Sequence, residues 1–146
     1  MSRKSKLIRI AAVPAVLLAV AACMHVSMMA ATPKPPASEF GYGPRASANG
    51  SFKATVEDST AFRKGAMLKP VVVRITKADG TPIDSMQFKV DGGMPQHGHG
   101  LPTRPRVTRQ LGNGRYQIEG LKFNMGGWWE LKLIGATDSV VFNVEL

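Results

Sequence analysis

Apolar and polar residues alternate with a period of two over much of the C-terminal part of the chain. Trp129, Leu131 and Leu133 are separated by charged residues, and the segment 139–146 repeats the pattern with Phe142 among its apolar members. A strand with one face in a core and the other in solvent produces this alternation. Both segments are therefore predicted to be half-buried antiparallel strands.

Glycine and proline interrupt residues 51–146 at roughly the eight- to twelve-residue spacing of small all-β domains. No segment has the periodicity of an amphipathic helix. The segment Gly112-Asn113-Gly114 is the strongest hairpin signal, because these residues tolerate positive φ. The pattern predicts an all-β antiparallel sandwich whose core is centred on Val90, Ile118, Trp129 and Phe142. Its seven strands are predicted at residues 51–57, 70–77, 84–91, 106–111, 115–119, 128–134 and 139–146.

The first 23 residues have the features of an export signal. Basic residues between Arg3 and Arg9 precede an apolar run, 10–22, which ends in small residues and Cys23. The segment 20–23, Val-Ala-Ala-Cys, resembles the lipobox of bacterial lipoproteins, in which the cysteine carries the lipid. Cys23 is the only cysteine, so no disulfide competes for it. We expect a lipid anchor on Cys23 that attaches the chain to a membrane.

Two other interpretations of this segment stay open. Ala30 and Ala31 are small enough to mark an ordinary cleavage site. Residues 10–31 also approach the ~20 residues that a membrane-spanning helix needs. All three interpretations place the domain in the cell envelope, on the periplasmic side. By analogy with lipoprotein sorting, Met24 in place of an aspartate after the cysteine favours the outer membrane.

Residues 24–50 are rich in alanine, proline, serine and glycine and have no apolar period. Such composition is typical of a partly extended tether. The predicted organisation is therefore a signal segment at 1–23, a disordered tether at 24–50 and a β domain at 51–146.

The formal charge of +9 overstates the charge of the domain. Fifteen basic and ten acidic residues follow Cys23, so that part carries +5. Only 104–109 forms a basic cluster, and the interleaved aromatic residues of a nucleic-acid surface are missing. We expect no nucleic-acid partner and a solvated strand face. A weak attraction to anionic lipid or an acidic partner stays open.

Metal-ligating side chains concentrate in one segment. Two of the three histidines, His97 and His99, follow Met94 within five residues of the sequence. If the strands alternate in direction, the loop with Met125 and the loop with Met67 lie at the same end of the sandwich as this segment. Imidazole and thioether groups are the ligands that copper selects. Zinc would want another histidine, a carboxylate or a thiolate, and calcium and magnesium want oxygen.

Simpler explanations of these residues are also open. A methionine in a small domain is most often a core residue, and histidines two apart in a polar loop are often only exposed. The Gly-Pro-rich segment with Trp128 and Trp129 could instead shape a docking surface. The sequence contains no nucleophile elbow, His-Glu-x-x-His or phosphate-loop motif, so we do not expect the protein to be an enzyme.

The domain resembles a known family of small exported bacterial proteins. Segment 90–103 has the sequence VDGGMPQHGHGLPT, segment 114–116 is GRY, and segment 120–129 is GLKFNMGGWW. With these motifs, residues 51–146 resemble the YtkA-like, FixH-related family. FixH itself carries a membrane helix, whereas the apolar run here ends in a lipobox-like cysteine.

The resemblance implies an immunoglobulin-like sandwich outside the cytoplasm and a role in cation handling or in assembly of a copper-containing oxidase. Met94, His97, His99 and Met125 match the motif positions of the family. We therefore expect an exported, membrane-tethered copper-binding module that passes metal to a copper-receiving or envelope protein. The alternative is a ligand-free structural or protein-interaction sandwich.

Overall fold

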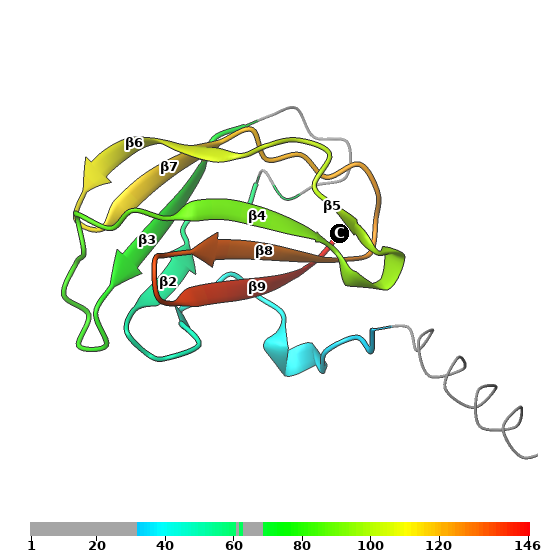
Figure 1. Ribbon diagram of the computed structural model, residues 1–146, viewed down its shortest axis with the longest axis horizontal. Coiled ribbons are helices and arrows are strands. Elements are labelled where there is room, and N and C mark those ends of the chain that lie inside the picture. Colours follow the sequence, from blue (N-terminus) through cyan, green and yellow to red (C-terminus); the bar gives the residue numbers. More distant parts are fainter. Residues whose placement is uncertain (1–31, 61, 63–68) are drawn as a thin grey trace, which may run out of the picture. The chain divides into compact units, whose positions relative to one another are not determined.

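Short runs of β-branched and aromatic residues pair into two antiparallel sheets in the computed structural model, which describes residues 32–60, 62 and 69–146 (Figure 1). The five-stranded sheet has the order β1-β2-β3-β7-β6 and the four-stranded sheet the order β5-β4-β8-β9. The strands are β1 (Arg45–Ala46), β2 (Lys53–Val56), β3 (Val71–Thr76), β4 (Lys89–Met94), β5 (His99–Gly100), β6 (Arg106–Gly112), β7 (Arg115–Glu119), β8 (Trp128–Ile134) and β9 (Ser139–Glu145). Two 3-10 turns, η2 (Ala37–Glu39) and η3 (Pro95–His97), are the helical elements of the described residues. The predicted sandwich is confirmed.

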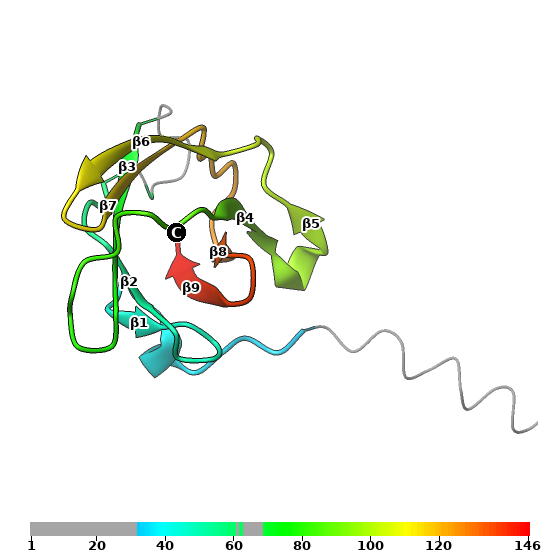
Figure 2. The same ribbon diagram turned by 60° about the vertical axis from the view of Figure 1, so that its left-hand side comes forward.

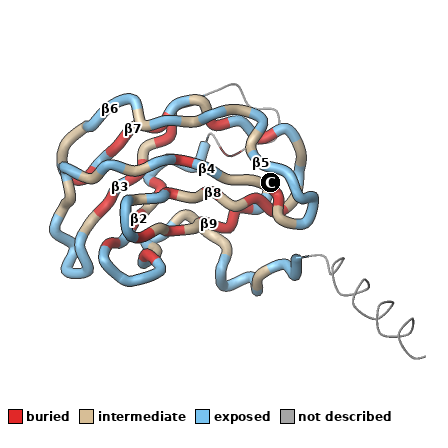
Figure 3. Tube along the Cα trace, in the orientation of Figure 1, coloured by how far each residue is buried: buried red, intermediate tan, exposed pale blue. Residues whose placement is uncertain are grey.

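The inner faces of the two sheets form the core. Figure 2 shows how the sheets are arranged, and Figure 3 shows the buried positions along the strands. The alternation predicted for β8 is present: Trp129, Leu131 and Leu133 are buried, while Glu130 and Lys132 lie on the other face. Val90, Ile118 and Phe142 are also buried, which confirms the predicted centre of the core. Truncating a core aromatic residue such as Trp129 costs about 3–5 kcal/mol.

The third predicted strand is displaced along the chain. Residues 84–91 were expected to form it, but β4 covers Lys89–Met94 instead. The hydroxyl of Tyr116 donates to the carbonyl of Ile83 at 2.6 Å and accepts from the amide of Met86 at 2.9 Å. These bonds hold residues 83–86 in a connection between the sheets, so the strand begins only after it.

Part of the predicted tether belongs to the domain. The strand β1 pairs with β2, and Ser47 is buried. The amide of Gly41 donates to the carbonyl of Asn143 at 3.1 Å, and Phe40 packs edge-to-face on Trp128 with ring centroids 6.5 Å apart. The domain therefore begins before Phe40, and Ser51 is not its boundary. Residues 40–48 cover the free edge of β9, which would otherwise expose unpaired backbone groups.

Segment 1–31 lies outside the described residues, so the expectations for Cys23 and the signal segment stay predictions. In the part of the chain that the structure describes, no helix has the length and apolar character needed to cross a membrane.

Candidate functional site

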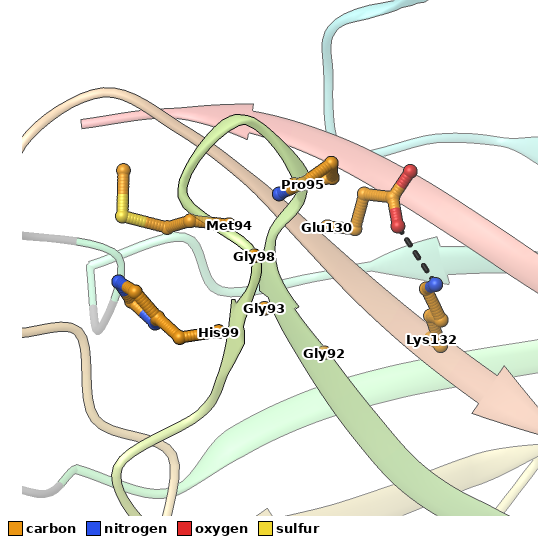
Figure 4. Close-up of a pocket in the computed structure, with 8 residues that line it drawn as sticks. All are labelled: Gly92, Gly93, Met94, Pro95, Gly98, His99, Glu130 and Lys132. Atoms are coloured by element: carbon orange, nitrogen blue, oxygen red, sulfur yellow. Dashed lines mark ion pairs between the residues drawn. The ribbon is translucent and has the colours of Figure 1, made fainter. Parts of the chain in front are cut away.

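The histidine segment is a tight hairpin between β4 and β5, closed by η3 (Figure 4). Gly98 adopts the left-handed conformation at φ 65°, and its amide donates to the carbonyl of Met94 at 3.0 Å. A Cβ on Gly93 would lie 2.5 Å from the carbonyl oxygen of His99. Glycine at these positions therefore allows the two strands to approach and the chain to reverse within η3.

Met94 and His99 are direct partners in the β4–β5 register. Directly opposite residues of an antiparallel pair project from the same face of the sheet. Figure 4 accordingly shows the Met94 thioether and the His99 ring on the same side of the hairpin. Met94 is 1% exposed, which places it in the core and at the end of a strand, not in a loop as expected. The Met94 side chain is thus buried on the same side of the hairpin as the His99 ring.

The two histidine rings lie close together and are exposed. Their centroids are 6.0 Å apart, and the ring planes differ by 39°. A metal–nitrogen distance of about 2.0–2.1 Å puts two imidazole centroids on one ion up to roughly 6.4 Å apart. The observed spacing therefore fits two imidazoles that share an ion.

A backbone carbonyl orients the His99 ring. Its Nδ1 lies 3.0 Å from the carbonyl oxygen of Gly100, which is a hydrogen bond when Nδ1 carries the proton. In that tautomer Nε2 has a free lone pair. Metal-ligating histidines are commonly fixed in this way, because the second nitrogen then points its lone pair at the ion.

Trp129 connects this hairpin with the loop between β7 and β8. Its ring packs edge-to-face on His99 at a centroid distance of 5.6 Å, and its Nε1 donates to the carbonyl of Met125 at 3.1 Å. The Met94 methyl lies close to Gly127, where a Cβ would be 3.1 Å away. The two loops thus meet at one end of the sandwich, as strand parity predicted. Met125 is half-buried against the core.

A shallow pocket of about 220 Å³ adjoins the hairpin and is lined by Gly92, Gly93, Met94, Pro95, Gly98, His99, Glu130 and Lys132 (Figure 4). Glu130 Oε2 and Lys132 Nζ form an ion pair at 2.8 Å. Figure 4 shows this carboxylate on the opposite side of the hairpin from the His99 ring. Glu130 therefore does not complete a donor set with the histidines.

The described residues contain no group of three or more histidine, cysteine, aspartate or glutamate side chains close enough to hold a metal ion. The donors that the structure brings together are His97 and His99, with the Met94 thioether on the same side of the hairpin as the His99 ring and Met125 on the adjoining loop. Met67 lies outside the described residues. The expectation of Met94, His97, His99 and Met125 as metal ligands stays a prediction.

Sequence reasoning did not include Trp129 in the site. Its position in an alternating strand predicted a core residue, and with Trp128 it was considered only for a docking surface. The signal that could have found it is strand parity, which places the start of β8 beside the histidine hairpin.

The fold and this end of the molecule define a small two-sheet antiparallel β-sandwich with an exposed two-histidine hairpin. The sequence profile of the YtkA-like family matches residues 46–134, and the chain belongs to that family. No match is found among curated proteins. Among solved structures, the "ZirS C-terminal Domain" is similar at 12% identity and a TM-score of 0.38, over 100% of this chain and 97% of the other.

Proposed function

We propose that this protein is an exported, membrane-tethered module that binds copper at the β4–β5 hairpin and hands it to an envelope protein. The observation that carries the proposal is the pair of exposed rings 6.0 Å apart, one of them oriented by a backbone carbonyl. The family resemblance of the Met-Pro-x-His-x-His motif supports it.

The available donors favour copper over the other common metals. Two imidazoles with a neighbouring thioether suit Cu(I), and imidazoles alone hold Cu(II). A structural zinc site wants four protein ligands, and the Glu130 carboxylate points to the other side of the hairpin. An exposed site with few protein ligands releases its ion readily, which suits transfer to a partner more than storage.

The cellular placement of the proposal depends on the sequence. The basic N-terminus, the apolar run and Cys23 support export and lipid attachment. A lipid anchor would keep the copper site at the periplasmic side of a membrane, where copper-receiving proteins of the envelope are accessible.

The test is a titration of the whole chain in detergent with Cu(I) against a competing chelator. We expect one ion per chain and at least tenfold weaker binding in His97→Ala and His99→Ala, because each change removes a ligand that the few-ligand site cannot replace. Gln96→Ala is the matched control, since Gln96 is exposed in the same turn and should leave the affinity unchanged.

Quenching of tryptophan fluorescence gives a second readout, because Trp129 touches the His99 ring. Binding weaker than the chelator, or binding that survives the double histidine change, would contradict the copper proposal. The ligand-free interaction sandwich would then be the better description.

A further inference from the structure

The outer face of the five-stranded sheet carries an unusual arrangement of arginines. Val73 and Ile75 of β3 and Tyr116 and Ile118 of β7 are buried in the core. Because strand residues alternate between faces, the exposed Arg74 and Arg115 point outward.

Arg74 and Arg115 are direct partners in the β3–β7 register. Their Cβ atoms are therefore only about 4.5–5.5 Å apart, and like charges placed opposite each other destabilise a sheet. Arg109 joins them from β6, where it is registered with Gln117, two residues from Arg115 on the same face. We call Arg74, Arg109 and Arg115 the arginine face.

No carboxylate neutralises the arginine face within the described residues. Their ion pairs are Lys34–Glu145 and Lys132–Glu130, and all ten acidic residues of the sequence lie in the described part. Glu119, an acid on the neighbouring part of β7, accepts a hydrogen bond from Gln117 at 2.6 Å. None of the three guanidinium groups is therefore ion-paired with a carboxylate in the described part of the chain.

We propose that the arginine face docks on the anionic phosphate headgroups of the membrane to which the chain is tethered. Guanidinium groups hold phosphate oxygens bidentately, and an anion between Arg74 and Arg115 removes their mutual repulsion. The positive charge of the arginine face is complementary to the negative charge of an anionic bilayer, which is therefore the proposed partner of this face. The inference rests on the proposed membrane attachment and does not depend on copper binding. Residues 24–39 span at most about 55 Å, so a lipid on Cys23 would keep the domain within reach of the bilayer.

The experiment uses the whole chain in bicelles, observed by amide NMR. Bicelles of phosphatidylcholine alone are compared with bicelles that contain phosphatidylglycerol. We expect amide shifts confined to β3, β6 and β7, reversed by high salt. In the variant Arg74→Gln/Arg109→Gln/Arg115→Gln the shift should fall at least fivefold, since each basic residue near an anionic surface contributes about a fivefold change in affinity.

The control variant Lys69→Gln/Lys89→Gln/Lys122→Gln removes the same charge from exposed positions off the arginine face and should keep the shifts. Equal loss in this control, shifts that survive the arginine changes, or no shift with anionic lipid would overturn the proposal. The proposal would also be overturned if soluble polyglutamate, added to bicelles of phosphatidylcholine alone, caused amide shifts as large as those with phosphatidylglycerol. That result would indicate an acidic protein partner. The copper affinity of the arginine variant should be unchanged. The lipid-docking proposal and the copper proposal can therefore fail independently of each other.

Discussion

At the scale of single residues, glycines decide where the histidine hairpin lies. A Cβ on Gly92 would lie 2.2 Å from the carbonyl oxygen of Glu130 in β8, a distance that no side chain can tolerate. A Cβ on Gly100, by contrast, would make ordinary contact at 3.5 Å with the carbonyl oxygen of Gly92. Glycine is therefore needed at the first position for β4 to pair with β8 and carry the hairpin.

Gly92→Ala should lower the free energy of unfolding of the domain by about 2–3 kcal/mol, because the added methyl forces β4 away from β8. Urea unfolding of the whole chain, followed by tryptophan fluorescence, measures the change. Gly100→Ala is the control and should have little effect. Equal stability of the two variants would contradict the close approach seen at Gly92.

At the scale of elements, one carboxylate joins two turns that are far apart in sequence. Asp138, between β8 and β9, accepts hydrogen bonds from the Ser51 hydroxyl at 2.6 Å and from the amides of Asn49 at 3.0 Å and Ser139 at 2.8 Å. Burial alone would raise the pKa of Asp138, but hydrogen bonds from Ser47, Ser51 and these amides outweigh it and lower the pKa well below its usual value. The turn between β1 and β2 is thereby fastened to the four-stranded sheet.

A lowered pKa in the folded state means that ionised Asp138 stabilises the fold. This stability is fully present above the unfolded pKa of about 3.9 and is lost as the pH falls toward the lower folded value. Asp138→Asn should therefore reduce the urea midpoint at pH 7 and flatten its fall between pH 5 and pH 2.

Asp79→Asn serves as the control for this pH profile. The amide and hydroxyl of Thr81 also lower the pKa of Asp79, but this exposed carboxylate bonds only within its own turn. We expect a smaller change in the midpoint. An Asp138 variant with the pH profile of the unmodified chain would show that the carboxylate does not fasten the turns.

At the scale of the whole molecule, the proposed roles are divided between separate regions. The candidate copper site lies on the β4–β5 hairpin of one sheet, and the arginine face lies on the outer side of the other sheet. Residues 40–48 run along β9 and across to β2, so the start of the domain is held to both sheets. The proposed attachment to a membrane rests on the sequence before residue 24.

Cys23→Ser should abolish lipid attachment, because the hydroxyl cannot form the thioether that carries the lipid. Mass spectrometry of the protein from a bacterium that processes lipoproteins would show a diacylglycerol-modified cysteine in the unmodified chain and none in the variant. A mature chain that begins after Ala31, or an intact N-terminus, would instead support a cleaved signal or a membrane anchor.

The sequence predicted the parts of the fold that depend on local alternation. Trp129, Leu131 and Phe142 lie where a period of two places them, and the Gly112–Gly114 turn joins β6 and β7 as expected. The prediction for the third strand ends too early in the sequence, because Gly92 and Gly93 are typical of a loop. Their place in β4 depends on the close approach of the neighbouring strands, which the sequence does not reveal. The predicted tether is too long, because the local sequence of residues 40–48 does not indicate that they bond to the edge strand β9.

The sequence by itself determined the sandwich class and the concentration of His97, His99 and Met94, because hydrophobic periodicity and residue chemistry are local properties of the chain. Only the tertiary structure decided that Met94 is buried, that Trp129 touches the His99 ring, and that Arg74 faces Arg115. These contacts depend on strand register and sheet packing, which join residues whose separation along the chain carries no signal of their meeting.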